Sequence, residues 1–160
     1  MTTSFEIANF IILQLESKQE TLSGMALQRY IFLLDGAHIL RHNEKLIDED
    51  FTIGNYGPVV KVLNDNIPER GAFIPLKDHR RINELTLEPE YKSIIHELPK
   101  AYAFKQEIIN DLNHIVANMS SSELIDAFYQ LKLNKEYGIM FEADIRNFFV
   151  KNPEFQIWNA

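Results

Sequence analysis

Apolar residues recur at helical spacing along most of the chain, and this pattern predicts a mainly helical protein. Near the N-terminus, apolar positions three and four residues apart form one face of a helix: Phe5, Ala8, Ile12 and Leu15. A second helix is predicted over about 24–42, because its centre, "YIFLLDGAHIL", is apolar on nearly every face. Such a helix normally lies in the middle of a bundle. We therefore expect Gly36, which costs stability inside a helix, to permit a close helix-helix approach.

The last third of the chain carries three further helical patterns. The first covers about 104–119, where the apolar positions are Phe104, Ile108, Leu112, Ile115 and Met119. Ser120 and Glu123 then form a Ser-x-x-Glu capping box, which predicts the start of the next helix. A final helix is predicted over 141–149, and Pro153 ends it.

The middle of the chain predicts a small amount of β structure. Residues 51–56 look extended, and the alternating segment 82–87, "INELTL", is a weak strand pattern that could pair with them. The motif Tyr56, Gly57, Pro58, Val59 follows, before a helix predicted over 59–66. Proline is tolerated in the first turn of a helix, and glycine accepts almost any backbone angle. We interpret the motif as a turn that ends the strand and starts the helix, with the tyrosine ring packed as an anchor.

These elements predict a mainly α fold, a compact helical bundle of about six to seven helices with a small β-hairpin or ribbon (strands near 51-56 and 82-87). The polar residues 18–23 are expected to form a loop, and a short helix is expected over 90–97. The 160 residues have the length of one domain and contain no repeat or linker. We therefore expect a single domain over 1–160 with an apolar tail at 153–160.

Composition and charge narrow the classes of function. The net charge is −7, and the densest basic patch is only "KDHRR" at 77–81, which does not favour nucleic-acid binding and suits a basic protein partner better. The chain has no cysteine, which excludes disulfides, thiolate metal sites and cysteine nucleophiles. The N-terminus lacks a secretory pattern, and no apolar run approaches the roughly 18 residues of a membrane span. We expect a cytoplasmic protein with no membrane association.

Motifs of enzymatic chemistry are missing from the sequence. There is no nucleophile elbow, no Gly-rich phosphate loop and no His-Glu-x-x-His zinc pattern. Asp35, His38 and His42 fall on one helix face, where a carboxylate and two imidazoles could converge on a metal. The preferred interpretation is a buried histidine with a hydrogen bond, followed by a histidine favoured by the helix C-terminus. We expect no catalytic residue, no metal and no cofactor.

Two groups of residues are candidates for binding a partner. The acidic run Asp48, Glu49, Asp50 is most simply a solvated loop, but it offers a charged face. In the tail, Phe155 and Trp158 lie beyond the proline that ends the last helix, and aromatic residues are favoured interface anchors. These two aromatics either fold back onto the protein or meet a partner, and folding back is the preferred interpretation.

The span 25–63, "MALQRYIFLLDGAHILRHNEKLIDEDFTIGNYGPVVKVL", resembles the signature of the Panacea domain, the phage-associated GepA-like or SocA-like family. The family pattern joins a Leu-x-Lys-Leu-Leu-Tyr helix to a segment that ends in Tyr-Gly-Pro-Val. Similar residues stand here at Leu27, Arg29, Phe32, Gly36, Leu46, Phe51, Tyr56, Gly57, Pro58 and Val59. Two departures indicate a divergent branch: Gly54 replaces a usual tryptophan, and Phe128-Tyr129 replaces a frequent Thr-His.

The resemblance implies a non-enzymatic antitoxin of a toxin-antitoxin system, encoded on a prophage or plasmid. Such a protein neutralises a neighbouring toxin by direct binding or as an adaptor that presents the toxin to a protease. Homo-oligomerisation stays open. An alternative is a phage or prophage regulatory protein acting at nucleic acid, which a basic face of Lys61, Lys77, Arg80 and Arg81 would favour. A third is an enzyme of unrecognised type, which a pocket enclosing Asp35, His38 and His42 would favour.

Overall fold

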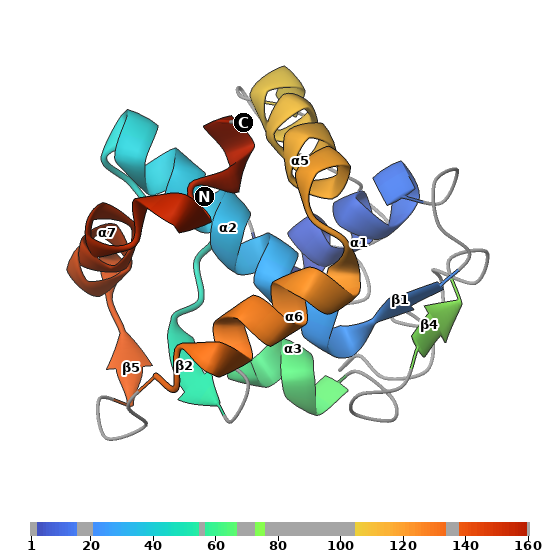
Figure 1. Ribbon diagram of the computed structural model, residues 1–160. Coiled ribbons are helices and arrows are strands. Elements are labelled where there is room, and N and C mark those ends of the chain that lie inside the picture. Colours follow the sequence, from blue (N-terminus) through green and yellow to red (C-terminus); the bar gives the residue numbers. More distant parts are fainter. Residues whose placement is uncertain are drawn as a thin grey trace.

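A long helix, α2 (Gly24–His42), runs through the middle of the protein and the other elements pack around it (Figure 1). The computed structural model describes residues 3–15, 21–54, 57–66, 73–75, 105–133 and 138–159. The other described helices are α1 (Ser4–Leu15), α3 (Lys61–Asn66), α5 (Lys105–Asn118), α6 (Ser121–Gln130) and α7 (Glu142–Lys151), followed by the 3-10 turns η4 (Pro153–Phe155) and η5 (Ile157–Asn159). The described strands are β1 (Thr21–Ser23), β2 (Phe51–Gly54), β3 (Gly57–Val59), β4 (Phe73–Pro75) and β5 (Ile139–Met140). The predicted mainly helical class with a small β element is confirmed.

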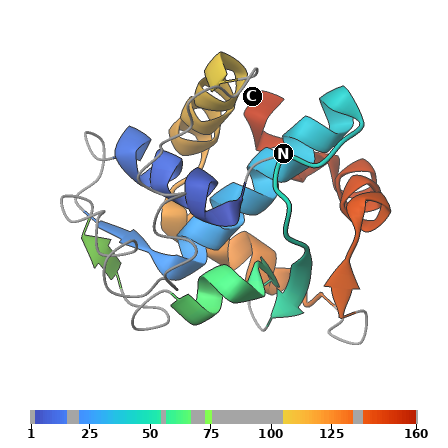
Figure 2. The same ribbon diagram turned by 180° about the vertical axis from the view of Figure 1, so that it is seen from behind.

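The apolar character of α2 on all sides is explained by its neighbours. It packs against α5, α6 and α7 on one side and α1 on the other, as the view from behind in Figure 2 shows for α1. Ser23 caps its start, because the side-chain oxygen accepts a hydrogen bond of 3.1 Å from the Ala26 amide. Asn43 ends it in a left-handed conformation, with φ of 57°.

Gly36 makes room for an aromatic ring of a neighbouring helix. A Cβ at this position would lie 2.1 Å from Cε2 of Phe149, which belongs to α7 and is fully buried. The Phe149 ring also packs 5.2 Å, centroid to centroid, from Phe32 of α2. The close approach expected at Gly36 is therefore made by α7, with a side chain rather than a helix backbone filling the space.

The three-stranded sheet is antiparallel with the order β3-β2-β5. The first four residues of the predicted strand at 51–56 form β2, and the last two lie outside the described residues. Strand β2 pairs with β3 and with β5, which the sequence pattern did not indicate. The predicted strand at 82–87 and the predicted helix at 90–97 lie outside the described residues. In the β2-β5 ladder, Phe51 faces Met140 and Thr52 faces Ile139.

Two sequence-based predictions were wrong at the level of local structure. Part of the expected loop at 18–23 is strand β1, which pairs antiparallel with β4. Gly57 to Val59 form strand β3, and the helix starts later, at Lys61. Gly57 has a φ of +122°, which does not fit the start of a helix, and Pro58 is tolerated because β3 is an edge strand.

The C-terminal elements close the fold. The predicted capping box is confirmed: the Glu123 amide donates to Ser120 Oγ, and the Ser120 amide donates to the Glu123 carboxylate, both at 3.1 Å. After α7, the two 3-10 turns fold back, and Trp158 packs 5.0 Å from the Phe149 ring. None of the described helices is long and apolar enough to cross a membrane.

Candidate functional site

Strand β3, which carries the Gly-Pro motif, is fastened to α2 by two polar residues. Val60, directly after β3, donates its amide to Gln28 Oε1 at 2.9 Å and accepts from Gln28 Nε2 at 3.3 Å. The adjacent Arg29 donates from Nη1 to the carbonyl of Pro58. Sequence reasoning missed these contacts, although a Gln-Arg pair inside an otherwise apolar helix is a signal for a buried polar contact. Tyr56 of the motif lies outside the described residues.

Arg29 is a buried cation that lies between the ring of Phe128 and Gly57. It is 1% exposed, and its guanidinium lies 5.5 Å from the centroid of the Phe128 ring. No carboxylate within the described residues pairs with it, and burial lowers the pKa of Arg29 to about 10, so it stays charged at neutral pH. A Cβ on Gly57 would lie 3.0 Å from the Arg29 Cζ. The glycine of the motif is therefore required both by its backbone angle and by this guanidinium.

The loop after α2 is shaped by a buried carboxylate. Asp35 accepts hydrogen bonds from the Leu46 amide at 2.6 Å and from Lys45 Nζ at 3.0 Å. Burial raises the pKa of Asp35, and the charge of Lys45 opposes that shift. The Lys45 ammonium also lies 5.4 Å from the centroid of the Phe51 ring, at the start of β2. Asp35 thus fixes the path by which the chain reaches the acidic run and the sheet.

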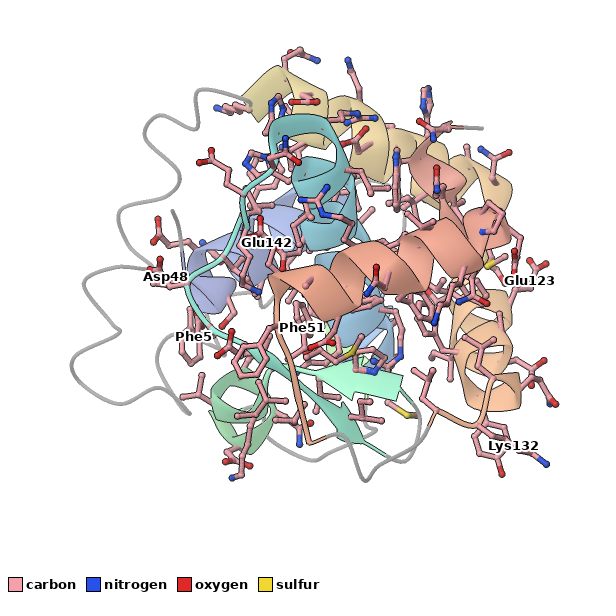
Figure 3. The ribbon with its side chains drawn as sticks, turned by 90° about the vertical axis from the view of Figure 1, so that its left-hand side faces the viewer. Phe5, Asp48, Phe51, Glu123, Lys132 and Glu142 are labelled. Atoms are coloured by element: carbon pink, nitrogen blue, oxygen red, sulfur yellow. The ribbon has the colours of Figure 1, made fainter. Side chains whose placement is uncertain are left out.

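The structure separates the members of the acidic run. Glu49 turns inward and accepts the Ser4 amide at 2.9 Å, together with the Ser4 hydroxyl, so it caps the start of α1. Burial raises the pKa of Glu49. Asp48 and Asp50 are exposed, and Figure 3 shows Asp48 on the outside of its loop. The run is one structural carboxylate flanked by two surface carboxylates.

The three residues that share a helix face in the sequence have different partners in the structure. Asp35 is engaged with Lys45, His38 Nε2 lies 3.6 Å from Glu44, and His42 Nε2 lies 2.8 Å from Glu107. Burial, followed by the charge of His42, lowers the pKa of His38. In the described part of the chain, no group of three histidine, aspartate or glutamate residues is arranged to hold a metal.

An open groove of about 460 Å³ lies between the end of α2, α5 and the C-terminal turn. It is lined by Arg41, Glu107, Asn110, Asp111, His114, Trp158 and Asn159. Arg41 Nη1 binds Asp111 at 2.6 Å and Glu107 at 3.0 Å, so the charges in the groove largely satisfy one another. His114 Nδ1 contacts the Trp158 carbonyl at 3.0 Å. These contacts join α5 to α2 and to the tail.

The remaining residues that the sequence suggested as binding candidates have the following positions. Phe155 and Trp158 are 6% and 2% exposed and pack against the protein's own core, so neither side chain lies at the surface. Lys61 is exposed and forms an i,i+4 ion pair with Asp65 at 2.7 Å. Lys77, Arg80 and Arg81, which would complete a basic face, lie outside the described residues.

Comparison with known families gives one match. A family model described as "Antitoxin SocA-like, Panacea domain" matches residues 27–133, which include most of α2, the β2-β3 hairpin, α5 and α6. No curated protein and no solved structure matches significantly. The matched segment includes Arg29, Gly57 and Pro58, the residues that fasten the hairpin to the central helix.

Proposed function

Because this chain belongs to the SocA-like antitoxin family with a Panacea domain, we propose that it is an antitoxin that neutralises a toxin encoded next to it. The observation that carries the proposal is the family match over two thirds of the chain. We further propose that the protein acts in the cytoplasm without catalysis, by binding the toxin directly or by presenting it to a protease.

The residues of the described site hold the fold together. The motif that contains Gly57 and Pro58 has a structural role, because these two residues hold β3 against Arg29 of α2. The titratable residues of α2 are engaged in ion pairs and hydrogen bonds with neighbouring elements. Action at nucleic acid gains no support from a net charge of −7.

Co-expression tests this function. The neighbouring gene is induced alone and together with this chain in a host strain, and growth is followed. We expect growth arrest with the neighbour alone and rescue when this chain is present, with a complex of the two proteins recovered on purification. Rescue that persists in a host lacking its ATP-dependent proteases would indicate direct inhibition, and rescue lost there would indicate delivery to a protease. Continued growth arrest with both proteins expressed would refute the antitoxin role.

A further inference from the structure

The three-stranded sheet has one face turned toward the core and one turned away from it. Phe51 and Met140 face each other across the β2-β5 ladder, and both are buried, with the Phe51 ring 5.1 Å from Phe32 of α2. Side chains alternate along a strand, so the next residue of β2, Thr52, points to the other face. Its partners are Val59 in β3 and Ile139 in β5. These three residues form a row across the outer face.

The outer face carries apolar side chains beside one threonine and is partly open to solvent. Ile139 is 45% exposed, and Thr52 and Val59 are half-buried. Phe141, two positions beyond Ile139, is 57% exposed. We call Thr52, Val59, Ile139 and Phe141 the outer patch. Isolated apolar side chains are normal on a protein surface, whereas contiguous exposed apolar patches are the ones associated with interaction sites.

Exposed carboxylates lie at one end of the outer patch. Asp50 directly precedes Phe51, and Phe141 directly follows Met140, so both flank the same end of the β2-β5 ladder. Asp144 lies beside the patch, because its carboxylate accepts the Phe141 amide at 2.8 Å. Asp50 and Asp144 are both exposed. The patch therefore has an acidic rim formed by Asp50 and Asp144.

We propose that the outer patch and its acidic rim are the surface that binds the toxin, through a toxin segment that carries an apolar side chain flanked by lysine or arginine. The inference rests on the proposed antitoxin function. An apolar centre with a charged rim is the usual anatomy of a protein interface. A specific interface covers roughly 800 Å² per partner, so the toxin would extend from the patch over the rim.

The negative charge of the rim favours a basic toxin segment over a second copy of this chain and over a nucleic acid. A second copy of this chain would bring its own outer patch, with the same two carboxylates, and like charges brought together oppose association. A nucleic acid would place phosphates against the same rim. A basic protein segment gains from the rim and from the net charge of −7, which also accelerates encounter.

The test measures the Kd and the association rate between this chain and the purified product of the neighbouring gene. Phe141→Ser removes the most exposed side chain of the patch, and serine is a favourable residue at this N-cap of α7, so the fold should persist. Its control is Val150→Ser, which removes a 63% exposed apolar side chain from α7. Asp50→Lys reverses a rim charge, and Asp126→Lys on the exposed side of α6 is its control.

We expect Phe141→Ser to weaken the Kd at least about tenfold and Asp50→Lys to slow association mainly at low salt. The two controls should stay within about twofold of the wild type, and all four variants should melt close to the wild-type temperature. Wild-type affinity in both Phe141→Ser and Asp50→Lys would overturn the proposed surface while leaving the antitoxin function intact. A dimer of the chain alone that Phe141→Ser dissociates would also overturn it, with a second copy as the occupant. A wild-type chain that neither binds nor rescues would refute the antitoxin function itself.

Discussion

Replacing Gly57 by alanine tests the contact that fastens the β2-β3 hairpin to α2. Gly57 has a φ of +122°, a backbone conformation that residues with a Cβ rarely adopt. The added Cβ would lie 3.0 Å from Cζ, 3.2 Å from Nε and 3.3 Å from Nη2 of Arg29. Arg29 has little freedom to retreat, because it is buried, hydrogen-bonded to Pro58 and packed near the Phe128 ring.

The expected loss of stability has two parts. A residue other than glycine held at such a backbone angle costs about 1–3 kcal/mol. Crowding a group that is fixed in the core adds about 1–3 kcal/mol. Gly57→Ala should therefore lower the free energy of unfolding by about 2–6 kcal/mol, a large share of the 5–15 kcal/mol typical of a domain.

Gly138→Ala is the matched control, because Gly138 also has a positive φ, +59°, but a Cβ there would meet no atom within 4 Å. Only the backbone cost remains, about 1–2 kcal/mol. Urea denaturation of both variants, with the slope m checked for constancy, gives the two losses. Equal losses in the two variants would refute the crowding against Arg29. The excess at Gly57 should also shrink when Arg29→Met removes the guanidinium, as a double-mutant cycle would measure.

Three further substitutions test the packing of the core and the dependence of stability on pH. Gly36→Ala places a Cβ 2.1 Å from the Phe149 ring, and the overpacking should cost about 1–3 kcal/mol in urea denaturation; an unchanged midpoint would contradict the close approach of α7. Trp158→Ala should cost about 3–5 kcal/mol, because the ring is buried against the protein's own core, and toxin rescue should fail only as stability does. Burial, and then the charge of His42, lowers the pKa of His38 below its ordinary 6.5. The stability that depends on neutral His38 is complete above pH 6.5 and falls as the pH drops through the lowered pKa. The denaturation midpoints measured at pH 7.5 and at pH 5 should therefore differ less in His38→Gln than in the wild type.

The family match bears out the resemblance found in the sequence, and several elements followed from local pattern alone. The apolar run of 24–42 matched a helix with those bounds, because a helix surrounded by neighbours must be apolar on every side. The capping box at Ser120 was readable because both partners lie within one turn of chain. The acidic run and the motif around Gly57 were also visible as sequence features, although their roles were not.

Only the tertiary structure decided what those features do. Whether Pro58 starts a helix or lies in an edge strand depends on β2 and on Arg29, which stands 29 positions earlier in the chain. Glu49 turns inward because Ser4 presents an open helix end to it, a contact across 45 positions that leaves the carboxylates on either side of it at the surface. Strand β5 lies far along the chain from β2, so nothing in the local pattern placed Ile139 beside Thr52. Local patterns encode periodicity and caps, whereas pairing between distant segments is set by which buried groups can satisfy one another once the chain has folded.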